Sequence, residues 1–425
     1  MGKKFQAMRG TRDVLPGEIE AWQAVEEAAR RQSSRFGFRE IRTPLFEATE
    51  LFARGVGDST DIVRKEMYTF PDRKGRSLTL RPEGTAGVAR ALIEAGLARP
   101  HELHRLYYMG PMFRYDRPQA GRYRQFHQWG AEIVGTKSPW ADVETVLLLV
   151  GLLTDLGLEG LVVKVNSVGD ETCRPAYQEK IRQALLPRRD ELCEDCRERL
   201  DRNPLRVLDC KVPSDREIVK DLPPMLDSLC DPCREHFDAV KQGLDAAGVR
   251  YEIDPGLVRG LDYYTRTAYE VHHGKLGAQS AVGGGGRYDG LIQLLGGPAV
   301  PAVGFSMGIE RTLIALEEEG RKPAPERDTI YLARGAGLGG QAVRLAQKLR
   351  STYAVALDLE ERGLGPQLKQ ADRIGARVAL ILGEDEAKAG EVTLKDLGSG
   401  EQRRVREAEL ESAIEQALRG PVART

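Results

Sequence analysis

The chain has 425 residues, with 63 Lys or Arg against 64 Asp or Glu, so its formal net charge is -1. This length allows two or three domains, and the balanced charge excludes a protein that binds nucleic acid through overall positive charge. Any nucleic-acid site must be a local basic patch. No apolar stretch reaches the roughly 18 residues that a membrane helix needs, and no secretory signal is visible. We therefore expect a cytoplasmic protein that does not span a membrane.

The first predicted elements alternate between helix and strand. Residues 17–36 have helical periodicity, and residues 38–44 alternate as a strand that ends at a proline. Residues 77–85 form a second strand that leads into an Ala-rich helix at 85–96, with Glu83 just before it. Two interpretations of Glu83 are open, because a carboxylate at a helix start either complements the helix dipole or faces a ligand ammonium group.

Residues 113–132, FRYDRPQAGRYRQFHQWGAE, combine four arginines and two carboxylates with aromatic residues. As a strand, the second half of this stretch would place five side chains on one face: Arg122, Arg124, Phe126, Gln128 and Glu132. One interpretation is an amphipathic hairpin with a solvated charged face. The other is a face that holds an anion at one end and a cationic or hydrogen-bonding ligand at the other.

A charged, helix-rich segment runs from residue 170 to about 246, and strands resume at Tyr251. This pattern predicts an insertion between strands of one larger sheet. The segment holds all six cysteines, including two CxxC pairs, Cys193 with Cys196 and Cys230 with Cys233. In a cytoplasmic chain, thiolates at this spacing favour one shared structural Zn²⁺ over disulfides. The gap between the pairs is longer than in the usual zinc ribbon, so reduced thiols without a metal are the alternative.

Three stretches after the insertion combine glycine with arginine. In residues 257–270, LVRGLDYYTRTAYE, a chain bend is expected to place Arg259. Residues 281–291, AVGGGGRYDGL, either let the backbone approach a ligand closely or form a flexible hairpin. Residues 301–316 pass from a strand into a helix with Arg311 in its first turns, and a buried arginine needs an anionic partner. The regular alternation predicts a mostly antiparallel sheet with helices.

A Pro-rich charged linker at residues 320–327 precedes a change of pattern. Short apolar strands alternate with helical stretches, which predicts an α/β domain of about a hundred residues. Six basic residues of this domain form either a patch for RNA phosphates or a solvated face: Lys369, Arg373, Arg377, Arg403, Arg404 and Arg406.

Four stretches, in this order, resemble the histidyl-tRNA synthetase family of class II aminoacyl-tRNA synthetases. They are RGTRDVLP, LRPEGT with FRYDRPQAGRYRQFHQWGAE, LVRGLDYYTRTAYE with GGGGRYDGL, and GFSMGIERT. The C-terminal QLKQADRIGARVALILG is similar to the anticodon-binding domain of that family. The resemblance covers nearly the whole chain. It implies an α+β catalytic core in two parts, 1–169 and 249–320, a helical insertion at 170–248, and an α/β anticodon-binding domain at 328–425.

This resemblance implies that the chain ligates L-histidine to its tRNA in two steps. Histidine and ATP form histidyl-adenylate and pyrophosphate, and the histidyl group then passes to the terminal ribose of the tRNA. Arg114 and Arg259 would contact the α-phosphate. Arg311 would contact the γ-phosphate and cover the adenine, with Phe126 on its other face and Mg²⁺ on the outer phosphates. A planar, permanently charged guanidinium suits these roles better than an ammonium group.

The family resemblance also assigns side chains to the amino acid. The matching positions near the α-amino group are Glu83, Thr85 and Gln128. The positions that would read or line the imidazole pocket are Glu132, Tyr263, Tyr264 and Tyr288. A site that pairs both imidazole nitrogens would reject isosteres better than apolar packing could.

Further expectations concern macromolecular partners. The N-terminal helix and strand resemble the motif that forms the homodimer interface in class II enzymes. Gln119, Arg122 and Arg124 are candidates for contact with the acceptor end of the tRNA. Asp116 departs from the family, which commonly has Glu there, so its contact with adenine or the tRNA end is in question.

A regulatory subunit of ATP phosphoribosyltransferase is the main alternative function. Such synthetase-like proteins lack the anticodon-binding domain and parts of LVRGLDYY. Both Arg259 and the C-terminal domain are present here, which favours the ligase. A synthetase-like sensor of uncharged tRNA would sit beside a kinase domain, for which 425 residues leave no room.

Overall fold

The computed structural model describes residues 5–57, 60–274, 280–323 and 329–419. Contacts divide the chain into two compact units, Met1–Ala324 and Pro325–Thr425. The predicted linker at 320–327 lies partly outside the described residues. Within these ranges, none of the helices combines the length and the apolar character that crossing a bilayer requires.

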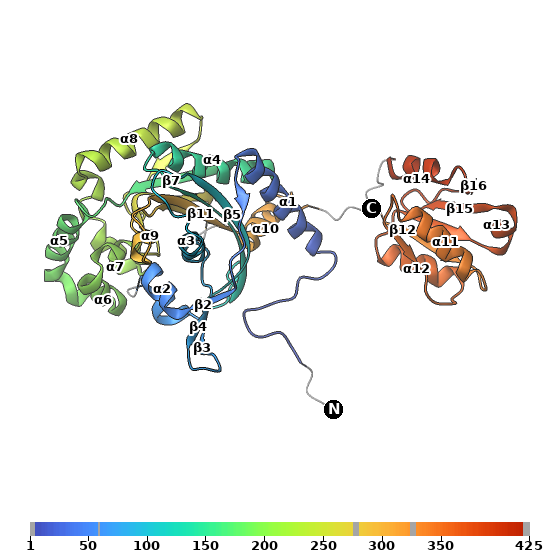
Figure 1. Ribbon diagram of the computed structural model, residues 1–425, viewed down its shortest axis with the longest axis horizontal. Helices are drawn as coiled ribbons and strands as arrows, with labels where there is room; N and C mark the ends of the chain where they lie inside the picture. Colours follow the sequence, from blue (N-terminus) through green and yellow to red (C-terminus); the bar gives the residue numbers. More distant parts are fainter. Residues whose placement is uncertain (1–4, 58–59, 275–279, 324–328, 420–425) are drawn as a thin grey trace. The chain divides into compact units, whose positions relative to one another are not determined.

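An eight-stranded sheet forms the centre of the first unit (Figure 1). Its strands, in order across the sheet, are β1 (Arg39–Glu40), β5 (His104–Phe113), β6 (Gln125–Val134), β11 (Ala302–Gly308), β10 (Ala281–Arg287), β9 (Thr265–His273), β7 (Leu161–Ser167) and β8 (Tyr251–Ile253). The two outermost pairs, β1–β5 and β7–β8, are parallel, and the five pairs between them are antiparallel. The prediction of a mostly antiparallel sheet is confirmed.

Strand alternation gives the two faces of this sheet different characters. In β6, Trp129, Ala131 and Ile133 point to one face, where they join the main apolar core. That core also contains side chains of three long helices and of the insertion's last helix: α1 (Ile19–Arg35), α4 (Pro139–Asp155), α10 (Ile309–Glu318) and α8 (Asp231–Ala246). On the other face, Gln128 and Glu132 alternate with these residues. That face packs a smaller core with α3 (Thr85–Glu94) and α9 (Leu291–Leu294).

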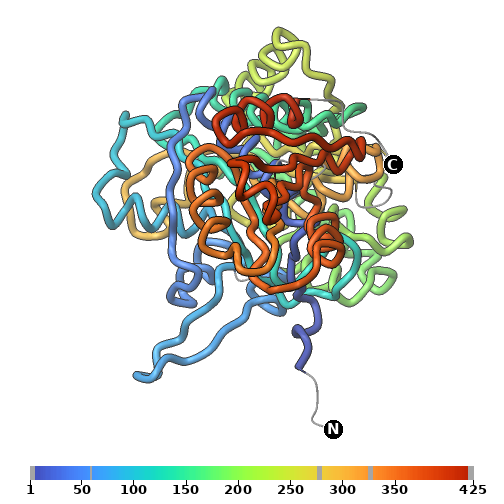
Figure 2. The backbone as a smooth tube through the Cα atoms, turned by 90° about the vertical axis from the view of Figure 1, so that its right-hand side faces the viewer, coloured from blue at the N-terminus to red at the C-terminus, as the bar shows by residue number. Residues whose placement is uncertain are grey.

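A small three-stranded sheet contains β2 (Phe46–Ala48), β4 (Ser77–Leu80) and β3 (Thr69–Pro71). The chain between β2 and β3 forms α2 (Thr49–Val56) and a π-helical turn, η1 (Ile62–Glu66). The β3–β4 hairpin, coloured light blue, projects from the body of the first unit (Figures 1 and 2).

The strand expected at residues 38–44 is much shorter than predicted, because β1 has only two residues. One further ladder bond follows β1, from the Ile41 amide to the Tyr107 carbonyl at 2.8 Å. The Thr43 carbonyl instead accepts a hydrogen bond from the Arg81 side chain at 3.2 Å, and Pro44 has no amide hydrogen to donate. The prediction was too long because the side chains alternate in the sequence up to Pro44, whereas the backbone leaves the sheet after Ile41.

The helical insertion lies between two neighbouring strands, as predicted. Its segments are α5 (Arg174–Leu185), η2 (Leu186–Glu191), α6 (Glu194–Arg202), η3 (Pro204–Asp209), α7 (Pro213–Val219), η4 (Met225–Ser228) and α8. Val163 of β7 lies directly opposite Tyr251 of β8, so the sheet continues across the insertion point. All six cysteines are free thiols, and the two CxxC pairs belong to different side-chain clusters. The sequence-based prediction that the two pairs share one metal site is therefore wrong.

A buried ion pair joins β10 to the start of α4. The side chains of Arg287 and Asp142 are both 0% exposed. Arg287 also donates hydrogen bonds to the carbonyls of Thr136 and Ser138, each at 2.9 Å. Burial works to raise the pKa of Asp142, but the charges and hydrogen bonds of Arg287 and His236 together outweigh this effect and the pKa is lowered. The pair fixes the N-terminus of α4 against the sheet.

Replacing Arg287 with Met should lower the free energy of unfolding by about 3–5 kcal/mol, because the buried charge of Asp142 would lose its arginine partner and keep only the contact with His236, at 3.2 Å, among its ion pairs within the described residues. Urea-induced unfolding of both proteins measures the difference. The control is Arg182→Met, which removes an exposed ion pair with Glu179 and should cost less than about 1 kcal/mol. Equal losses in the two variants would contradict a structural role for the buried pair.

The second unit is an α/β domain, as predicted. Its sheet has the order β13 (Val355–Leu357), β12 (Ile330–Arg334), β14 (Val378–Leu382), β15 (Glu391–Asp396) and β16 (Gln402–Arg406). The first three are parallel, and β15 and β16 add an antiparallel hairpin. The helices are α11 (Gly339–Leu349), α12 (Leu364–Arg373), α13 (Glu384–Ala389) and α14 (Leu410–Arg419). Arg377 is 7% exposed and donates to the Ala417 carbonyl at 3.1 Å, so it is not part of an exposed basic patch.

Candidate active site

A cleft with a volume of about 500 Å³ lies over strands β6, β9, β10 and β11. Nine of the predicted site residues line it: Glu83, Thr85, Arg114, Phe126, Gln128, Arg259, Tyr263, Tyr264 and Arg311. The other two, Glu132 and Tyr288, are buried behind the lining and connect to it through Thr85. The fold thus gathers residues that lie as far apart in the chain as Glu83 and Arg311.

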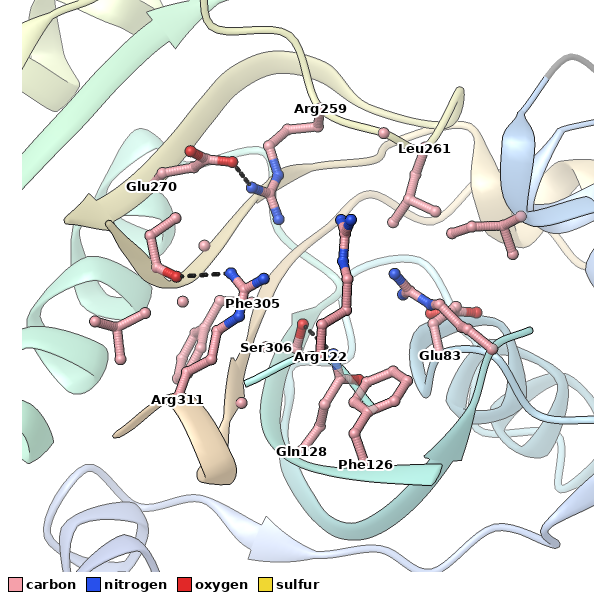
Figure 3. Close-up of a pocket in the computed structure, with 18 of the residues that line it drawn as sticks. Glu83, Arg122, Phe126, Gln128, Arg259, Leu261, Glu270, Phe305, Ser306 and Arg311 are labelled. Atoms are coloured by element: carbon pink, nitrogen blue, oxygen red, sulfur yellow. Dashed lines mark hydrogen bonds and ion pairs between the residues drawn. The ribbon is translucent and has the colours of Figure 1, made fainter. Parts of the chain in front are cut away.

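One end of the cleft is rich in guanidinium groups. Arg122, Arg259 and Arg311 point into the same space from three different segments (Figure 3). Arg114 lies 5.4 Å from the centre of the Phe126 ring, and its Nε donates to the Pro82 carbonyl at 2.8 Å. Burial lowers the pKa of Arg311, and the charges of Arg122 and Arg114 lower it further. An anion in this space would relieve that repulsion, so the geometry suits phosphate groups.

Arg259 is held in position by contacts at both ends. Its guanidinium forms an ion pair with Glu270 of β9, and its carbonyl accepts a hydrogen bond from Arg206 at 3.1 Å. Burial works to lower the pKa of Arg259, but Glu270 together with Tyr264 and Tyr263 outweighs it and the pKa is raised. Burial likewise works to raise the pKa of Glu270, and Arg259 together with His272 brings it down to about 2. The pair stays ionised throughout the physiological range.

The other end of the cleft is built around a buried carboxylate. Glu132 is 1% exposed and accepts hydrogen bonds from Thr85 Oγ1 at 2.8 Å and from Tyr108 OH at 3.3 Å. Tyr288 OH is a third donor. Burial raises the pKa of Glu132 to about 8, although these hydrogen bonds work to lower it. A ligand that brings a positive charge or an additional N–H donor would stabilise the ionised form.

Glycine on the neighbouring strand makes room for this carboxylate. Gly304 of β11 lies directly opposite Glu132, and a Cβ atom there would overlap the Glu132 side chain. Gly130 is likewise opposite Tyr108, whose ring occupies the space a side chain would need. These close approaches explain why small residues recur on the strands beneath the cleft.

Glu83 and Gln128 present polar groups between the two ends. The Glu83 carboxylate accepts hydrogen bonds from the amides of Thr85 and Ala86, at 2.6 and 2.9 Å, so it complements the start of α3 and also lines the cleft. Burial raises its pKa. Gln128 Nε2 donates to Ser306 Oγ at 3.3 Å (Figure 3). Gln128 Oε1 is buried with no hydrogen-bond partner within the described residues, which leaves an acceptor for a ligand ammonium group.

Three tyrosines form an aromatic wall beside Glu132. The ring centres of Tyr263 and Tyr264 are 4.8 Å apart, and those of Tyr263 and Tyr288 are 5.4 Å apart. All three hydroxyl groups are buried, and burial raises their pKa values, so they remain protonated donors.

The strand face predicted from residues 113–132 is only partly correct. β6 begins at Gln125, so Arg122 and Arg124 precede the strand. Gly121, at φ +69°, turns the chain at the hairpin tip, and ladder pairing starts beyond it. Arg122 forms an ion pair with Asp116 at 2.9 Å. Arg124 stacks over Tyr115, with 3.7 Å from its guanidinium carbon to the ring centre.

Sequence reasoning missed two residues of the site, Glu270 and Tyr108. Glu270 ends the stretch LVRGLDYYTRTAYE, and a carboxylate that follows a placed arginine was a usable signal. Its pairing with Arg259 depends on how the chain enters β9, whose second residue, Arg266, adopts φ +52°. For Tyr108 the sequence showed only strand alternation. Its ring lies over its cross-strand neighbour Gly130, and its hydroxyl group donates to Glu132, and neither contact is visible in the sequence.

Comparisons with known proteins cover almost all of the chain. A profile of the family described as histidyl-tRNA synthetase matches residues 10–312, and one described as anticodon binding domain matches residues 330–417. The histidine–tRNA ligase of Synechococcus elongatus is 51% identical over 407 residues, which is 96% of this chain and 94% of that protein. The histidine–tRNA ligase of Moorella thermoacetica is 51% identical over 400 residues, 93% of this chain and 95% of that protein.

A solved structure agrees with these sequences. The crystal structure of apo S. aureus histidyl-tRNA synthetase superimposes with a TM-score of 0.80 at 36% identity, covering 98% of this chain and 100% of that one. The antiparallel sheet, its arginine-lined cleft and the separate α/β unit define a class II aminoacyl-tRNA synthetase. Within that class, the chain belongs to the histidyl-tRNA synthetase family.

Proposed function

We propose that this protein ligates L-histidine to its tRNA, by way of histidyl-adenylate formed from ATP. The observation that carries the proposal is a single cleft with guanidinium groups at one end and the buried Glu132 network at the other. Identity of 51% to two histidine–tRNA ligases over nearly the full chain supports the same reaction.

In the first step, a carboxylate oxygen of histidine attacks the α-phosphorus of ATP. The bond from that phosphorus to the bridging oxygen breaks, and pyrophosphate leaves with the electron pair. Negative charge accumulates on the α-phosphate oxygens, so fixed cationic donors lower the barrier. Arg114 and Arg259 are our candidates for these donors. The Glu270 ion pair fixes the Arg259 head before the substrate arrives.

ATP would occupy the cationic end of the cleft. Arg311 would contact the γ-phosphate and one face of the adenine, and Phe126 the other face. Mg²⁺ bound with ATP would neutralise charge on the outer phosphates. Glu66 and Asp209 line the same cleft with carboxylate oxygens, the type of ligand that Mg²⁺ prefers. Structural zinc at the cysteines is a separate proposal, because those side chains lie in the insertion.

Histidine would occupy the other end. Its α-amino group would contact Glu83, Thr85 and Oε1 of Gln128, which has no hydrogen-bond partner in the described part of the chain. Glu132 and Tyr264 would pair with the imidazole nitrogens. Tyr263 and Tyr288 complete the walls of this pocket. Discrimination would come from buried polar groups that a wrong side chain leaves unpaired.

In the second step, a hydroxyl of the terminal ribose attacks the adenylate carbonyl, and AMP leaves. We propose that Gln119, Arg122 and Arg124 contact the acceptor end of the tRNA. Arg122 and Asp116 both line the cleft. Asp116, whose side chain is shorter than the Glu common in the family, forms an ion pair with Arg122 of the same loop. The C-terminal unit would bind the anticodon stem through exposed basic residues: Lys369, Arg373, Arg403, Arg404 and Arg406.

A homodimer and a functional division of the chain complete the proposal. Phe46 and Phe70 of the small sheet are 51% and 41% exposed, and Leu45, just before β2, is 43% exposed. Such apolar side chains favour an interface. We divide the chain into a catalytic core at 1–169 and 249–320, an insertion at 170–248 and an anticodon-binding domain at 328–425. Because its substrates serve protein synthesis, we place the enzyme in the cytoplasm.

Charging of tRNA tests the proposal against the regulatory alternative. With ATP, Mg²⁺ and unfractionated bacterial tRNA, the protein should attach histidine and none of the other standard amino acids. Periodate-oxidised tRNA is the control, because it lacks the terminal ribose hydroxyls. A protein that stimulates ATP phosphoribosyltransferase and charges no tRNA would be the regulatory subunit instead. The match of residues 330–417 to an anticodon-binding domain favours charging.

A further inference from the structure

The six cysteines of the insertion fall into two clusters, each of three cysteines and one aspartate. Cluster 1 contains Cys193, Cys196, Cys210 and Asp215. Cluster 2 contains Asp170, Cys173, Cys230 and Cys233. In each cluster the four candidate ligand atoms lie within 4.8 Å of one another. The two clusters have the same composition, and in the sequence cluster 1 lies between the two halves of cluster 2.

Distances within the clusters match those around a tetrahedral zinc ion. With zinc–sulfur bonds of about 2.3 Å, tetrahedral sulfurs lie about 3.8 Å apart, and a sulfur and a carboxylate oxygen about 3.6 Å apart. The Sγ atoms of Cys193 and Cys210 are 3.9 Å apart, as are those of Cys173 and Cys233. Sulfur to carboxylate oxygen is 3.4 Å in cluster 1, from Cys210, and 3.7 Å in cluster 2, from Cys173. A disulfide would need about 2.05 Å between sulfurs.

Both CxxC pairs have the same backbone geometry. Cys193 precedes α6 with φ -62° and ψ 161°, and Cys230 precedes α8 with φ -67° and ψ 159°. In each pair the second cysteine follows in the first turn of its helix. This arrangement turns both sulfurs toward one point, and the N-terminal end of the helix stabilises thiolate charge.

The aspartates are placed as ligands rather than as surface carboxylates. Asp215 is 0% exposed, and its two oxygens accept hydrogen bonds from the Cys193 amide at 3.2 Å. Within the described residues, no lysine, arginine or histidine forms an ion pair with Asp215. Burial of an ionised carboxylate without a cation is costly, so cluster 1 lacks a positive charge that its geometry requires.

Asp170 of cluster 2 also contacts an arginine outside the cluster, Arg266. Its Oδ1 faces the sulfurs of Cys173 and Cys230, each at 3.7 Å. Its Oδ2 accepts a hydrogen bond from Arg266 at 3.3 Å. A ligating carboxylate that is also hydrogen-bonded from outside is the usual arrangement in metal sites.

We propose that each cluster binds one structural Zn²⁺, so that the chain carries two. Three thiolates and one carboxylate form a closed tetrahedral set, which leaves no position for a substrate and indicates structural rather than catalytic ions. Soft sulfur ligands in this geometry select zinc over magnesium or calcium.

The two sites would support the loop that carries Arg259, Tyr263 and Tyr264. On the side of cluster 2, Arg266 follows Tyr264, and Arg174, next to Cys173, donates to the Tyr264 carbonyl at 2.5 Å. On the side of cluster 1, Arg206 of η3 donates to the Arg259 carbonyl. The insertion thus supports the catalytic loop from behind, and this consequence rests on the proposed function of the loop.

Metal analysis of the full chain, expressed in zinc-supplemented medium and purified without chelator, tests the proposal. We expect two zinc ions per chain in the wild type and one each in Cys196→Ser and Cys233→Ser. The matched control is Asp195→Ala, which lies between the cysteines of one pair but outside the cluster, and it should keep both ions.

Cobalt substitution supplies a second readout that does not depend on folding of a variant or on activity. The wild-type protein reconstituted with Co²⁺ should show intense thiolate-to-cobalt absorption corresponding to two tetrahedral sites. A wild type with no stoichiometric metal and no such absorption would overturn the proposal. One zinc per chain that is lost in both cysteine variants would also overturn it, in favour of a single shared site.

Discussion

Arg259→His should lower the rate of histidine-dependent ATP–pyrophosphate exchange by at least about 10²–10³-fold, the range found when one fixed donor to a developing charge is removed. The imidazole is shorter than the guanidinium and is mostly neutral at pH 7.5. It therefore cannot reach the α-phosphate position as a permanent cation. The loss should appear mainly in kcat, because the interaction strengthens as charge develops in the transition state.

The matched control for this substitution is Arg250→His, at an exposed arginine outside the cleft. It should retain normal exchange. Circular dichroism and thermal unfolding of both variants separate a catalytic loss from a folding defect. Normal exchange in folded Arg259→His would remove this arginine from the catalytic groups.

The same substitution should change how stability depends on pH. The folded-state pKa of Glu270 is depressed to about 2 from its ordinary value of 4.5. Its stabilising contribution is therefore fully present above about pH 4.5 and is lost as the pH falls through about 2. Arg259→His removes the part of that contribution that comes from Arg259, whereas His272 remains beside Glu270. The stability deficit of the variant relative to the wild type should therefore be larger at pH 6 than at pH 3.

Glu132→Gln should weaken histidine binding by at least about 10²-fold, because a site built to pair polar groups fails when one of them is changed. ATP affinity should change little, since Glu132 lies at the opposite end of the cleft from the arginines. Isothermal titration with histidine and with a non-hydrolysable ATP analogue measures both affinities. Glu94→Gln, at an exposed position on α3, is the matched control.

The Glu132 variant should also be more stable than the wild type in the absence of histidine. Burial raises the pKa of Glu132 from 4.5 to about 8, so between these values the folded state binds more protons than the unfolded state. Stability of the wild type therefore falls as the pH rises from about 4.5 to 8, by up to about 1.4 kcal/mol per pH unit from this group. Glutamine does not titrate, so its advantage in Tm should grow across this range.

Two outcomes would contradict this account of Glu132. A variant that binds histidine normally would show that the carboxylate does not read the imidazole. A constant difference in Tm between pH 5 and pH 8 would show that Glu132 titrates near its ordinary value.

The sequence predicted the architecture well because its elements have strong periodic patterns. The antiparallel core, the helical insertion and the α/β unit each follow from alternation or helical spacing and from the change of pattern at the linker. Strand length was less predictable. The backbone leaves the sheet after Ile41, although the side chains continue to alternate, because the Thr43 carbonyl accepts a hydrogen bond from the Arg81 side chain and not from a neighbouring strand.

Individual site residues were predictable where the family resemblance supplied a motif, and not where a contact depends on tertiary structure. Nine of the proposed residues line one cleft. Glu270 and Tyr108 were missed because their partners lie before the start of their strand or on a neighbouring strand. Arg377 was grouped with exposed basic residues although it is buried. The sequence around a buried arginine does not differ from that around an exposed one when other basic residues are near.

The cysteines illustrate the same limit. Two CxxC pairs in one segment suggested one shared ion, since sequence shows only which cysteines are close in the chain. The fold instead completes each pair with one cysteine and one aspartate from elsewhere in the insertion. Aspartate as a fourth ligand could not be selected from the many carboxylates of so charged a segment.

Histidine-dependent ATP–pyrophosphate exchange tests the central claim most directly, because it requires both ends of the cleft and no tRNA. Purified full-length protein with ATP, Mg²⁺ and labelled pyrophosphate should exchange label into ATP when L-histidine is added. The other standard amino acids should give only the background rate. Absence of histidine-dependent exchange in folded protein would contradict the assignment of this cleft to histidyl-adenylate formation.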